Sequence, residues 1–341
     1  MSVIISPVSE SLRSFLGQKD YSQIIVLADV NTKKYCYPLI KDSLPKHKLI
    51  VVKSGEEYKN LTTCEQIWSA MTEAELDRHA LMINLGGGVV GDMGGFCAAT
   101  YKRGIDFIQI PTTLLAQVDA SVGGKLGIDF GGLKNHIGVF TQPQSVLIDS
   151  TFLETLSERE KRSGFAEIIK HCLIQDGDKW NEIRRKDLEQ QDWADLITHS
   201  VEIKKKVVAQ DPTEKGLRKI LNFGHTLGHA IETYFLPNGK KRLLHGEAIA
   251  TGMLCESYIS LEKNLIDQKT LSQIEEFIFS VYGKVPMKAT DFEAIIHHTQ
   301  QDKKNKGKEI RFSLINGAGS CLYDVVVSKK EMIRALEYYV N

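Results

Sequence analysis

Two histidines stand four residues apart in the segment LNFGHTLGHAIE, as His225 and His229. On a helix this spacing places both imidazole rings on one face. The pair can share a metal ion, or one ring can bind the metal while the other carries a proton. Because histidines at this spacing also occur on ordinary helix surfaces, the pair alone leaves its role open.

A third histidine and a glutamate extend this pattern. His245 precedes a helical pattern in HGEAIA, and Glu167 lies in GFAEIIKH with Lys170 one turn later. A carboxylate with two imidazoles suits a catalytic zinc ion that keeps one position open. Glu167, His225 and His245 are therefore candidate metal ligands, provided that the fold brings them together.

A glycine-rich segment follows an apolar run in LMINLGGGVVGDMGGF, residues 81–96. Gly86, Gly88 and Gly91 have the spacing G-x-G-x-x-G, which lets main-chain N–H groups approach a pyrophosphate at the start of a helix. The pattern is weak by itself, because it starts late in the chain and acidic residues follow it only at imperfect distances. A turn that packs a helix onto a sheet is the alternative.

A second glycine-rich loop is expected in DASVGGKLGIDFGGLKNHIG, residues 119–138. Lys125, Lys134 and Asn135 stand among its glycines and suit a phosphate group, although a solvated loop has the same composition. Arg218 and Asn222 shortly precede His225, so they can be directed into the same cleft. An exposed arginine is the commoner case.

The elements that must position these residues change in character near residue 150. Before it, the strand-like runs QIIVLAD, KLIVVKSG, ALMINLGGG, DFIQIPTT and SVLIDS alternate with helical patterns. This alternation favours a parallel sheet covered by helices. After it, apolar residues recur at helical spacing, with weak strand signals only near EIRFSLING and CLYDVVV. We predict an α/β domain followed by a mainly α-helical domain.

Composition excludes some classes of protein. Lys plus Arg equals Asp plus Glu at 43 each, so no net field attracts nucleic acid or acidic membranes. No run of 18 apolar residues and no signal-peptide pattern occurs, and the six cysteines form no C-x-x-C pair. We expect a soluble, cytoplasmic chain with reduced thiols.

Six motifs, in this order, resemble those of the 3-dehydroquinate synthases: GGGVVGDMGGF, IPTTLLAQVDASVGGK, GLKNHIG, FAEIIKH, LNFGHTLGHAIE and HGEAIA. The match runs from about residue 54 to about residue 315. The resemblance implies a Rossmann-like NAD-binding domain over residues 1–150 and a mainly helical domain for metal and substrate over residues 151–341. It also implies a homodimer that binds a small sugar phosphate.

The reaction that the resemblance implies belongs to the shikimate pathway of aromatic amino acid and chorismate biosynthesis. It converts 3-deoxy-D-arabino-heptulosonate 7-phosphate into 3-dehydroquinate and phosphate, as a carbon–oxygen lyase. NAD oxidises the substrate transiently at C5, phosphate leaves by elimination, the hydride returns, and an intramolecular aldol step closes the ring. A Zn²⁺ or Co²⁺ ion polarises the C5 oxygen.

The resemblance also implies roles for individual residues. It assigns Glu167, His225 and His245 to the metal, and it makes His229 a proton carrier. The residues that it implies for substrate binding and catalysis are Arg103, Asp119, Lys125, Asn135, Lys170, Lys204, Glu214, Arg218, Asn222 and one of Lys303 and Lys304. The residues that it implies for NAD are Asp29, Asn31, Glu56, Lys59, Gly87, Gly88, Val89, Asp92, Thr112, Thr113, Lys125, Lys134, Phe152 and Thr155. Arg103 is expected to reach across a dimer interface.

Three alternative functions would use the predicted site residues differently. Another sugar phosphate cyclase shares the nucleotide and metal residues but lacks a partner for a substrate carboxylate, which Arg218 supplies here. An NAD- and metal-dependent polyol dehydrogenase has no use for a phosphate loop, and a non-catalytic NAD-binding scaffold has no use for a metal triad. Asp129, His136 and Cys172 depart from the usual family residues, which puts the polarity of the pocket in doubt.

Overall fold

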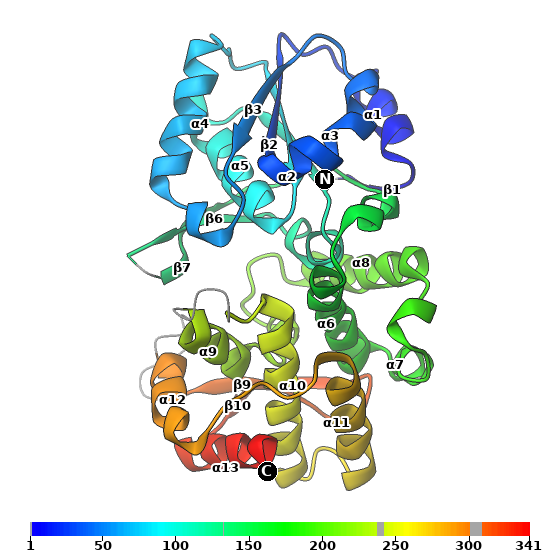
Figure 1. The fold of residues 1–341 in the computed structure, drawn as a ribbon, viewed down its shortest axis with the longest axis vertical. Coiled ribbons are helices and arrows are strands. Elements are labelled where there is room, and N and C mark those ends of the chain that lie inside the picture. The colour runs from blue at the N-terminus through cyan, green and yellow to red at the C-terminus, as the bar shows by residue number, and fades with distance from the viewer. Residues whose placement is uncertain (1, 132, 237–241, 301–308) are drawn as a thin grey trace. The chain divides into compact units, whose positions relative to one another are not determined.

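The computed structural model describes residues 2–131, 133–236, 242–300 and 309–341. The chain divides into two compact units, residues 1–157 and 158–341 (Figure 1). Throughout the described ranges, every helix is too short or too polar to cross a membrane.

The first unit is built on a six-stranded sheet in the order β1-β8-β5-β4-β2-β3, with every neighbouring pair parallel. Its strands are β1 (Ser2–Ile5), β2 (Ile24–Asp29), β3 (Lys48–Val52), β4 (Leu81–Gly86), β5 (Asp106–Pro111) and β8 (Ser145–Ile148). The prediction of a parallel sheet is confirmed, and all five predicted strands are present. The prediction missed β1, a four-residue edge strand whose pattern is too short to recognise.

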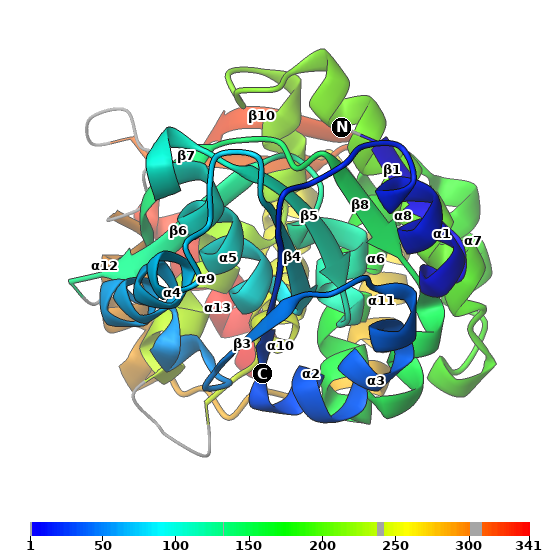
Figure 2. The same ribbon diagram turned by 90° about the horizontal axis from the view of Figure 1, so that it is seen from above.

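Helices cover both faces of this sheet (Figure 2). They are α1 (Val8–Leu16), α2 (Val30–Tyr35), α3 (Tyr37–Ile40), α4 (Leu61–Glu73) and α5 (Gly88–Thr100). Ile24 and Val26 belong to the core on the α1 and α3 side, whereas Ile25 and Leu27 belong to the core with α4 and α5. Successive strand residues therefore serve opposite cores, which is why the strands read as continuous apolar runs.

A hairpin replaces the predicted second glycine-rich loop, so that prediction was wrong. The strands β6 (Lys125–Phe130) and β7 (Leu133–Phe140) pair antiparallel. Leu126 and Ile128 pack into the core with α5, while a Cβ atom on Gly138 would lie 2.2 Å from the carbonyl oxygen of Leu126. Because glycine is needed where these strands approach closely, glycines interrupt the alternation that would have marked a strand.

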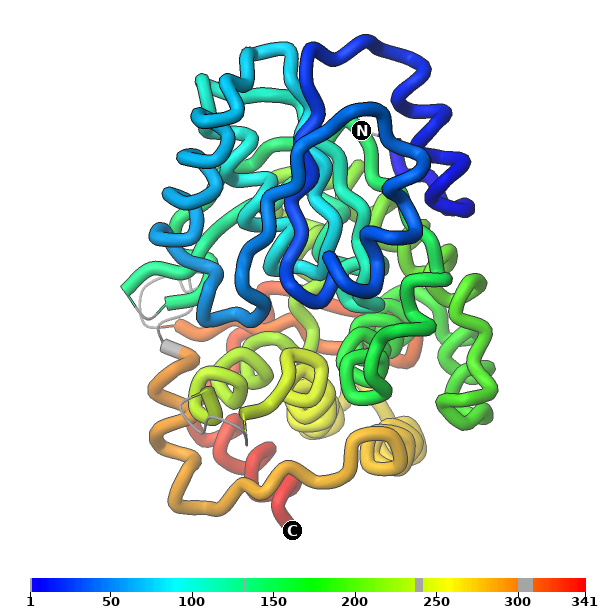
Figure 3. The backbone as a smooth tube through the Cα atoms, turned by 45° about the horizontal axis from the view of Figure 1, so that its top comes forward, coloured from blue at the N-terminus to red at the C-terminus, as the bar shows by residue number. Residues whose placement is uncertain are grey.

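The second unit is mainly helical, as predicted. Its helices are α6 (Glu158–Gln175), α7 (Gly177–Ile183), α8 (Trp193–Gln210), α9 (His225–Phe235), α10 (His245–Glu262), α11 (Gln268–Tyr282), α12 (Phe292–Gln300) and α13 (Lys329–Val340). The strands β9 (Arg311–Ile315) and β10 (Cys321–Val326) form an antiparallel pair where the two weak strand signals lie. Helix α10 is buried among α6, α9, α11 and α13 (Figures 1 and 3).

Short helical turns complete the two units. They are η1 (Lys41–Ser43), η2 (Glu56–Tyr58), η3 (Tyr101–Arg103), η4 (Ala116–Ala120), η5 (Ser150–Thr155), η6 (Leu188–Gln190), η7 (Leu217–Asn222) and η9 (Ala289–Asp291). Several of them carry residues that the sequence marks as functional, including those on η2, η4 and η7. These residues are thus held on short helical segments rather than within long helices.

Candidate active site

The glycine-rich segment of the first unit joins β4 directly to α5. Gly87 caps the helix, and within the described residues no side-chain hydrogen bond caps this end of α5. A Cβ atom on Gly87 would lie 2.8 Å from Cγ2 of Thr113, and one on Gly86 would lie 2.5 Å from Cβ of Val90. The bare backbone therefore leaves an uncapped helix N-terminus, which is suited to binding a phosphate group.

The later glycines of the same segment have a packing role. A Cβ atom on Gly94 would lie 2.1 Å from Oδ1 of Asn84, and one on Gly95 would lie 2.5 Å from Cδ2 of Leu126. The packing interpretation of the glycines is therefore confirmed for the later part of the segment, and the phosphate-binding interpretation stays a prediction for its first part. The first glycines keep the helix end open, and the later ones let the helix lie against the sheet and the hairpin.

A buried lysine connects two of the motifs in this unit. The Lys59 ammonium donates hydrogen bonds to Oδ2 of Asp92 at 2.7 Å and to Oδ1 of Asn135 at 2.6 Å, and Lys59 is only 3% exposed. Burial opposes its charge, but Asp92 and Glu56 outweigh this effect and raise the pKa of Lys59. The structure thus places residues predicted for NAD and a residue predicted for the substrate phosphate in one charged cluster.

Asp129, one of the departures from the usual family residues, orients a member of that cluster. Its Oδ1 accepts the backbone N–H of Asn135 at 2.8 Å, and its own N–H donates to the carbonyl of Lys59 at 2.9 Å. Asn135 has a positive φ of 49°, a conformation that asparagine tolerates better than most residues. A carboxylate at position 129 therefore fixes the strained backbone beside the predicted phosphate ligand.

The remaining predicted residues of the first unit lie on several turns. Asp29 caps α2 through the N–H groups of Asn31 and Thr32. Lys134 Nζ lies 3.8 Å from Oε1 of Glu56. Thr112 and Phe152 are buried, Val89, Thr113 and Asp119 are half-buried, and Arg103, Lys125 and Thr155 are exposed.

In the second unit, a glutamate and two histidines converge from three helices. Oε1 of Glu167, on α6, lies 3.3 Å from Nε2 of His225, the first residue of α9, and 3.4 Å from Nε2 of His245, the first residue of α10. Glu167 is fully buried, and its Oε1 atom has no hydrogen-bond partner among the described residues. One carboxylate oxygen and two imidazole nitrogens thus face a common point, as the ligands of a zinc ion do.

The approach of α9 to α10 depends on glycine and on a buried carboxylate. Gly224 has a φ of 78°, and a Cβ atom on Gly252 would lie 2.1 Å from the carbonyl oxygen of Gly224. The Glu256 carboxylate of α10 accepts the N–H groups of Gly224 at 2.6 Å and of Leu227 at 3.0 Å. Glu256 therefore caps α9 at the turn that carries His225.

The protonation of this cluster follows from its charges. Burial works to raise the pKa of Glu167, but Lys170 and His225 hold that pKa well below its ordinary value. Burial and the Lys170 ammonium lower the pKa of His225. Burial also acts to lower the pKa of His245, but Glu232 and Glu167 raise it to about 10. A metal ion must therefore displace a proton from His245 before it can bind that ring.

His229 lies one turn after His225 on α9, as its spacing predicts. The ring centroids of His229 and His225 are 5.0 Å apart, and those of His229 and His245 are 5.7 Å apart. One nitrogen of each of the three rings lies within 4.8 Å of the others. His229 is half-buried, more exposed than His225, so it adjoins the cluster on a more open side.

Other predicted residues of this unit lie on α6, α8 and the turn before α9. Lys170 is buried and forms an ion pair with Glu167, and Lys204 is also buried. Asn222 donates from Nδ2 to Oε1 of Glu214 at 2.7 Å, and Arg218 donates from Nη1 to the carbonyl of Pro212 at 2.7 Å. Lys303 and Lys304 lie outside the described residues.

Two glutamates at the cluster were missed by the sequence analysis. Glu256 gave no usable signal, because it lies in an apolar helix far along the chain from its partners. Glu232 did have a usable sequence signal, because it stands seven residues after His225 and so lies on the same helical face. That face of α9 therefore presents His225, His229 and Glu232 in succession.

Comparisons with known proteins agree with this arrangement. Family models for the N-terminal and C-terminal parts of 3-dehydroquinate synthase match residues 49–163 and 164–305. The chain is 39% identical over 343 residues to a 3-dehydroquinate synthase of Parabacteroides distasonis, covering 99% of this chain and 97% of the relative.

Two solved structures have the same fold. One is 2-epi-5-epi-valiolone synthase of Streptomyces hygroscopicus subsp. jinggangensis with bound NAD⁺ and Zn²⁺, with a TM-score of 0.86, 25% identity, and coverage of 99% of this chain and 96% of that one. The other is 2-deoxy-scyllo-inosose synthase with carbaglucose-6-phosphate, NAD⁺ and Co²⁺, with the same four values. The fold of this chain is thus that of the sugar phosphate cyclases. Within that class, the chain belongs to the 3-dehydroquinate synthase family.

Proposed function

We propose that the chain converts 3-deoxy-D-arabino-heptulosonate 7-phosphate into 3-dehydroquinate and inorganic phosphate, with NAD and a divalent metal ion as cofactors. The observation that carries this proposal is the convergence of Glu167, His225 and His245 in a chain of this family. The division of labour follows the two units: the parallel-sheet unit binds NAD, and the helical unit binds the metal.

The glycine-rich turn fits the pyrophosphate of NAD. It offers the uncapped N-terminus of α5 at Gly87 and Gly88, and Thr113 leaves no room there for a larger residue. When bound, NAD supplies a reversible hydride acceptor, so that the substrate is oxidised and reduced again within one turnover. Lys59 and Asp92 hold each other beside this helix, and we assign them to the nicotinamide and ribose end of the cofactor.

The cluster of Glu167, His225 and His245 fits a zinc or cobalt ion, because Oε1 of Glu167, which has no hydrogen bond to any described residue, faces two ring nitrogens. When bound, the metal supplies a Lewis acid that polarises a substrate oxygen. The carboxylate and two neutral imidazoles leave such an ion a net charge of about +1. That charge suits an alcohol that must lose its proton.

The chain's own residues bind the substrate and move its protons. Arg218 is buried, and its planar guanidinium suits a bidentate bond to the substrate carboxylate. Lys204 and Asn222 are assigned to the carboxylate and hydroxyls of the substrate, and Lys170 is assigned to the region of its reacting carbons. His229, half-buried beside the cluster, is assigned to carry a proton from a substrate hydroxyl.

Residues of the first unit are assigned to the phosphate and to the ring. Asn135 and Lys125 have side-chain groups that suit phosphate oxygens, and Asn135 is held by Asp129 and Lys59. Asp119, with Glu214 of the second unit, is assigned to the region of the reacting carbons.

We also propose that the enzyme works in the cytoplasm as a homodimer, with Arg103 contributed across the interface. Arg103 is exposed and has a positive φ of 69° on a short turn, so its side chain is available to a second copy. Light scattering of the purified protein tests the dimer. An active monomer with intact kinetics would remove Arg103 from the site.

One assay tests the reaction itself. Phosphate release from the heptulosonate phosphate should require only a catalytic amount of NAD, with 3-dehydroquinate as the carbocyclic product. Absorbance of NADH should show no net rise, because the hydride returns to the substrate. Stoichiometric NADH would identify a dehydrogenase, and a different cyclic product would identify another sugar phosphate cyclase.

A further inference from the structure

The two metal-site histidines differ in what holds their second ring nitrogen. Nδ1 of His225 lies 3.0 Å from the carbonyl oxygen of Phe223, a backbone group two residues earlier. Nδ1 of His245 lies 3.2 Å from Oε2 of Glu232, a side chain on another helix. The orientation of His225 is thus set locally, whereas that of His245 depends on a residue of α9.

Glu232 is built into this position. It is 5% exposed and lies seven residues after His225, so the same helical face that carries one metal-site histidine also reaches the other. Its carboxylate meets one edge of the His245 ring, while Oε1 of Glu167 lies 3.4 Å from Nε2 on the opposite edge. The ring is therefore held between two carboxylates that have different tasks.

We propose that Glu232 is a positioning residue for the metal site. Its carboxylate accepts the Nδ1–H of His245, which fixes the tautomer that leaves the Nε2 lone pair free to bind the metal and fixes the rotation of the ring. This proposal rests on the assignment of Glu167, His225 and His245 as ligands. A carboxylate partner matters more for His245 than it would for His225, because the surrounding protein encloses the His245 ring less fully. The His245 side chain is 26% exposed and that of His225 is 10% exposed.

The physical reason is orientation. A metal-bound imidazole whose other nitrogen donates to a carboxylate is held at the correct angle and is a better donor, and loss of such a partner usually weakens metal binding about 10- to 100-fold. A glutamine at position 232 keeps a carbonyl oxygen that can accept Nδ1–H. A leucine of similar length keeps the volume and removes the acceptor.

The test measures metal affinity by chelator competition, with Zn²⁺ as the probe, for wild type, Glu232→Leu, Glu232→Gln and Thr233→Ala. Thr233 is the matched control, since it is the next residue of α9 and is half-buried. We expect the leucine variant to bind Zn²⁺ about 10- to 100-fold more weakly, the glutamine variant to retain most of the affinity, and the control to match wild type. Equal losses in the glutamine and leucine variants, or no loss in either, would overturn the proposal.

Two further measurements distinguish a change at the metal site from a folding defect. The visible spectrum of bound Co²⁺ should change in the leucine variant and not in the control, because the ring changes its geometry at the metal. In wild type with Zn²⁺, ¹⁵N NMR of the imidazoles should show a proton on Nδ1 of His245, and a metallated Nδ1 would overturn the proposal. A wild type that binds no Zn²⁺ would instead overturn the metal assignment itself.

Discussion

Two neighbouring helices of the second unit carry the same type of ion pair in very different surroundings. On α6, Glu167 pairs with Lys170 three residues later, and the two side chains are 0% and 1% exposed. On α7, Lys179 pairs with Glu182, also three residues later, and these side chains are 13% and 45% exposed. The residue types and the spacing are the same, the order along the helix is reversed, and the main difference between the two pairs is their burial.

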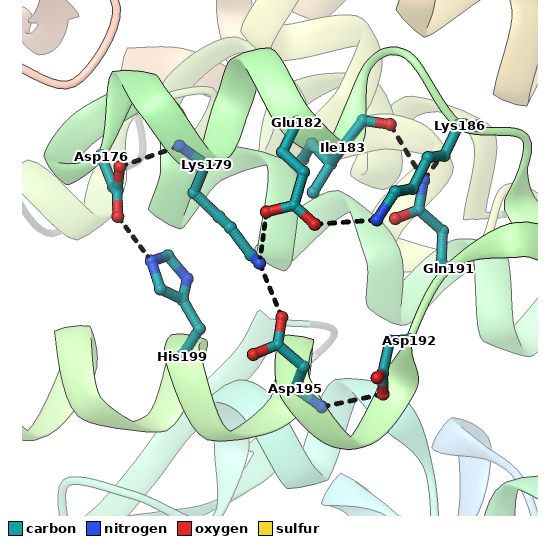
Figure 4. Close-up of polar contacts among 9 residues, drawn as sticks. All are labelled: Asp176, Lys179, Glu182, Ile183, Lys186, Gln191, Asp192, Asp195 and His199. Carbon is teal, nitrogen blue, oxygen red and sulfur yellow. Dashed lines mark hydrogen bonds and ion pairs between the residues drawn. The ribbon is translucent and has the colours of Figure 1, made fainter.

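The exposed pair belongs to a network of charged and polar groups that bond to one another (Figure 4). Lys179 bonds to Glu182 at 2.7 Å and to Asp195 at 2.6 Å, and Lys186 bonds to the other oxygen of Glu182 at 2.8 Å. His199 lies 2.8 Å from Asp176 in the same network. Water screens these charges, so each contributes little to stability.

The buried pair is arranged differently, because one of its oxygens is left over. Lys170 contacts Oε2 of Glu167, and Oε1 faces His225 and His245 without a hydrogen bond in the described part of the chain. A buried carboxylate with an unsatisfied oxygen is costly unless a cation binds it. The comparison indicates that an incompletely satisfied buried cluster, rather than a high density of charges, marks the functional site.

The largest predicted effect separates the two histidines of α9. His225→Ala should lose bound metal and all measurable activity, since it removes one of three proposed ligands. His229→Ala should keep its metal and lose turnover by about 10²- to 10⁴-fold, the range for a positioned acid or base. Metal analysis of both purified variants, with rates at saturating metal, measures the two effects.

A surface histidine provides the control for this pair. His199→Ala removes an imidazole from the exposed network, so it should change neither the metal content nor the rate. Equal metal loss in the His225 and His229 variants would show that His229 ligates or orients the metal. The proton-carrier role would then have to be withdrawn.

The next effect contrasts the two lysines. Lys170→Met removes the lysine partner of the buried Glu167 carboxylate and should lower the free energy of unfolding of the metal-free protein by about 3–5 kcal/mol. Lys179→Met, the matched change on α7, should cost about 0.2–1 kcal/mol. Urea unfolding with chelator present measures both.

Added Zn²⁺ sharpens this contrast. A cation bound at Glu167 replaces part of the lost charge, so the deficit of Lys170→Met should shrink with metal, whereas that of Lys179→Met should not change. Equal costs for the two variants would mean that the burial of the α6 pair has no energetic consequence, and the comparison would fail.

The sequence was sufficient for the elements whose pattern is regular. The strands of the parallel sheet are apolar runs bounded by turns, and His225 and His229 lie on one helix as their spacing requires. The β6–β7 hairpin was missed because its glycines, needed for close approach of the strands, erase the period of two. The spacing of residues within one helix or strand can be interpreted from the sequence, because the geometry of that element fixes it. A close approach between two strands cannot be predicted in this way.

Contacts between residues that are distant in the chain could also not be predicted from the sequence. The carboxylate of Glu256 caps α9 by accepting the N–H of Gly224, 32 positions earlier in the chain. That contact depends on how two glycine-containing helices approach each other, and no local pattern records it. The convergence of Glu167 with His225 and His245 became an expectation only through the resemblance to a family.

The smallest predicted effect concerns Glu182 and its dependence on pH. Hydrogen bonds from Lys179 and Lys186 lower the pKa of Glu182 from 4.5 to about 2. Because the folded state holds the charged form more strongly than the unfolded state does, this contribution to stability is complete above the unfolded pKa. It is lost as the pH falls from about 5 through the folded pKa.

Glu182→Gln should therefore lower the free energy of unfolding at pH 7 by less than about 1 kcal/mol, since the carboxylate is 45% exposed and screened by water. The difference from wild type should shrink at pH 4 and in 1 M salt, because protonation and screening both weaken the ion pairs. An NMR titration of the Glu182 carboxyl gives its pKa directly. A midpoint near 4.5 would show that the lysines do not hold this carboxylate in solution, and the surface network would then contribute even less than the comparison with α6 assumes.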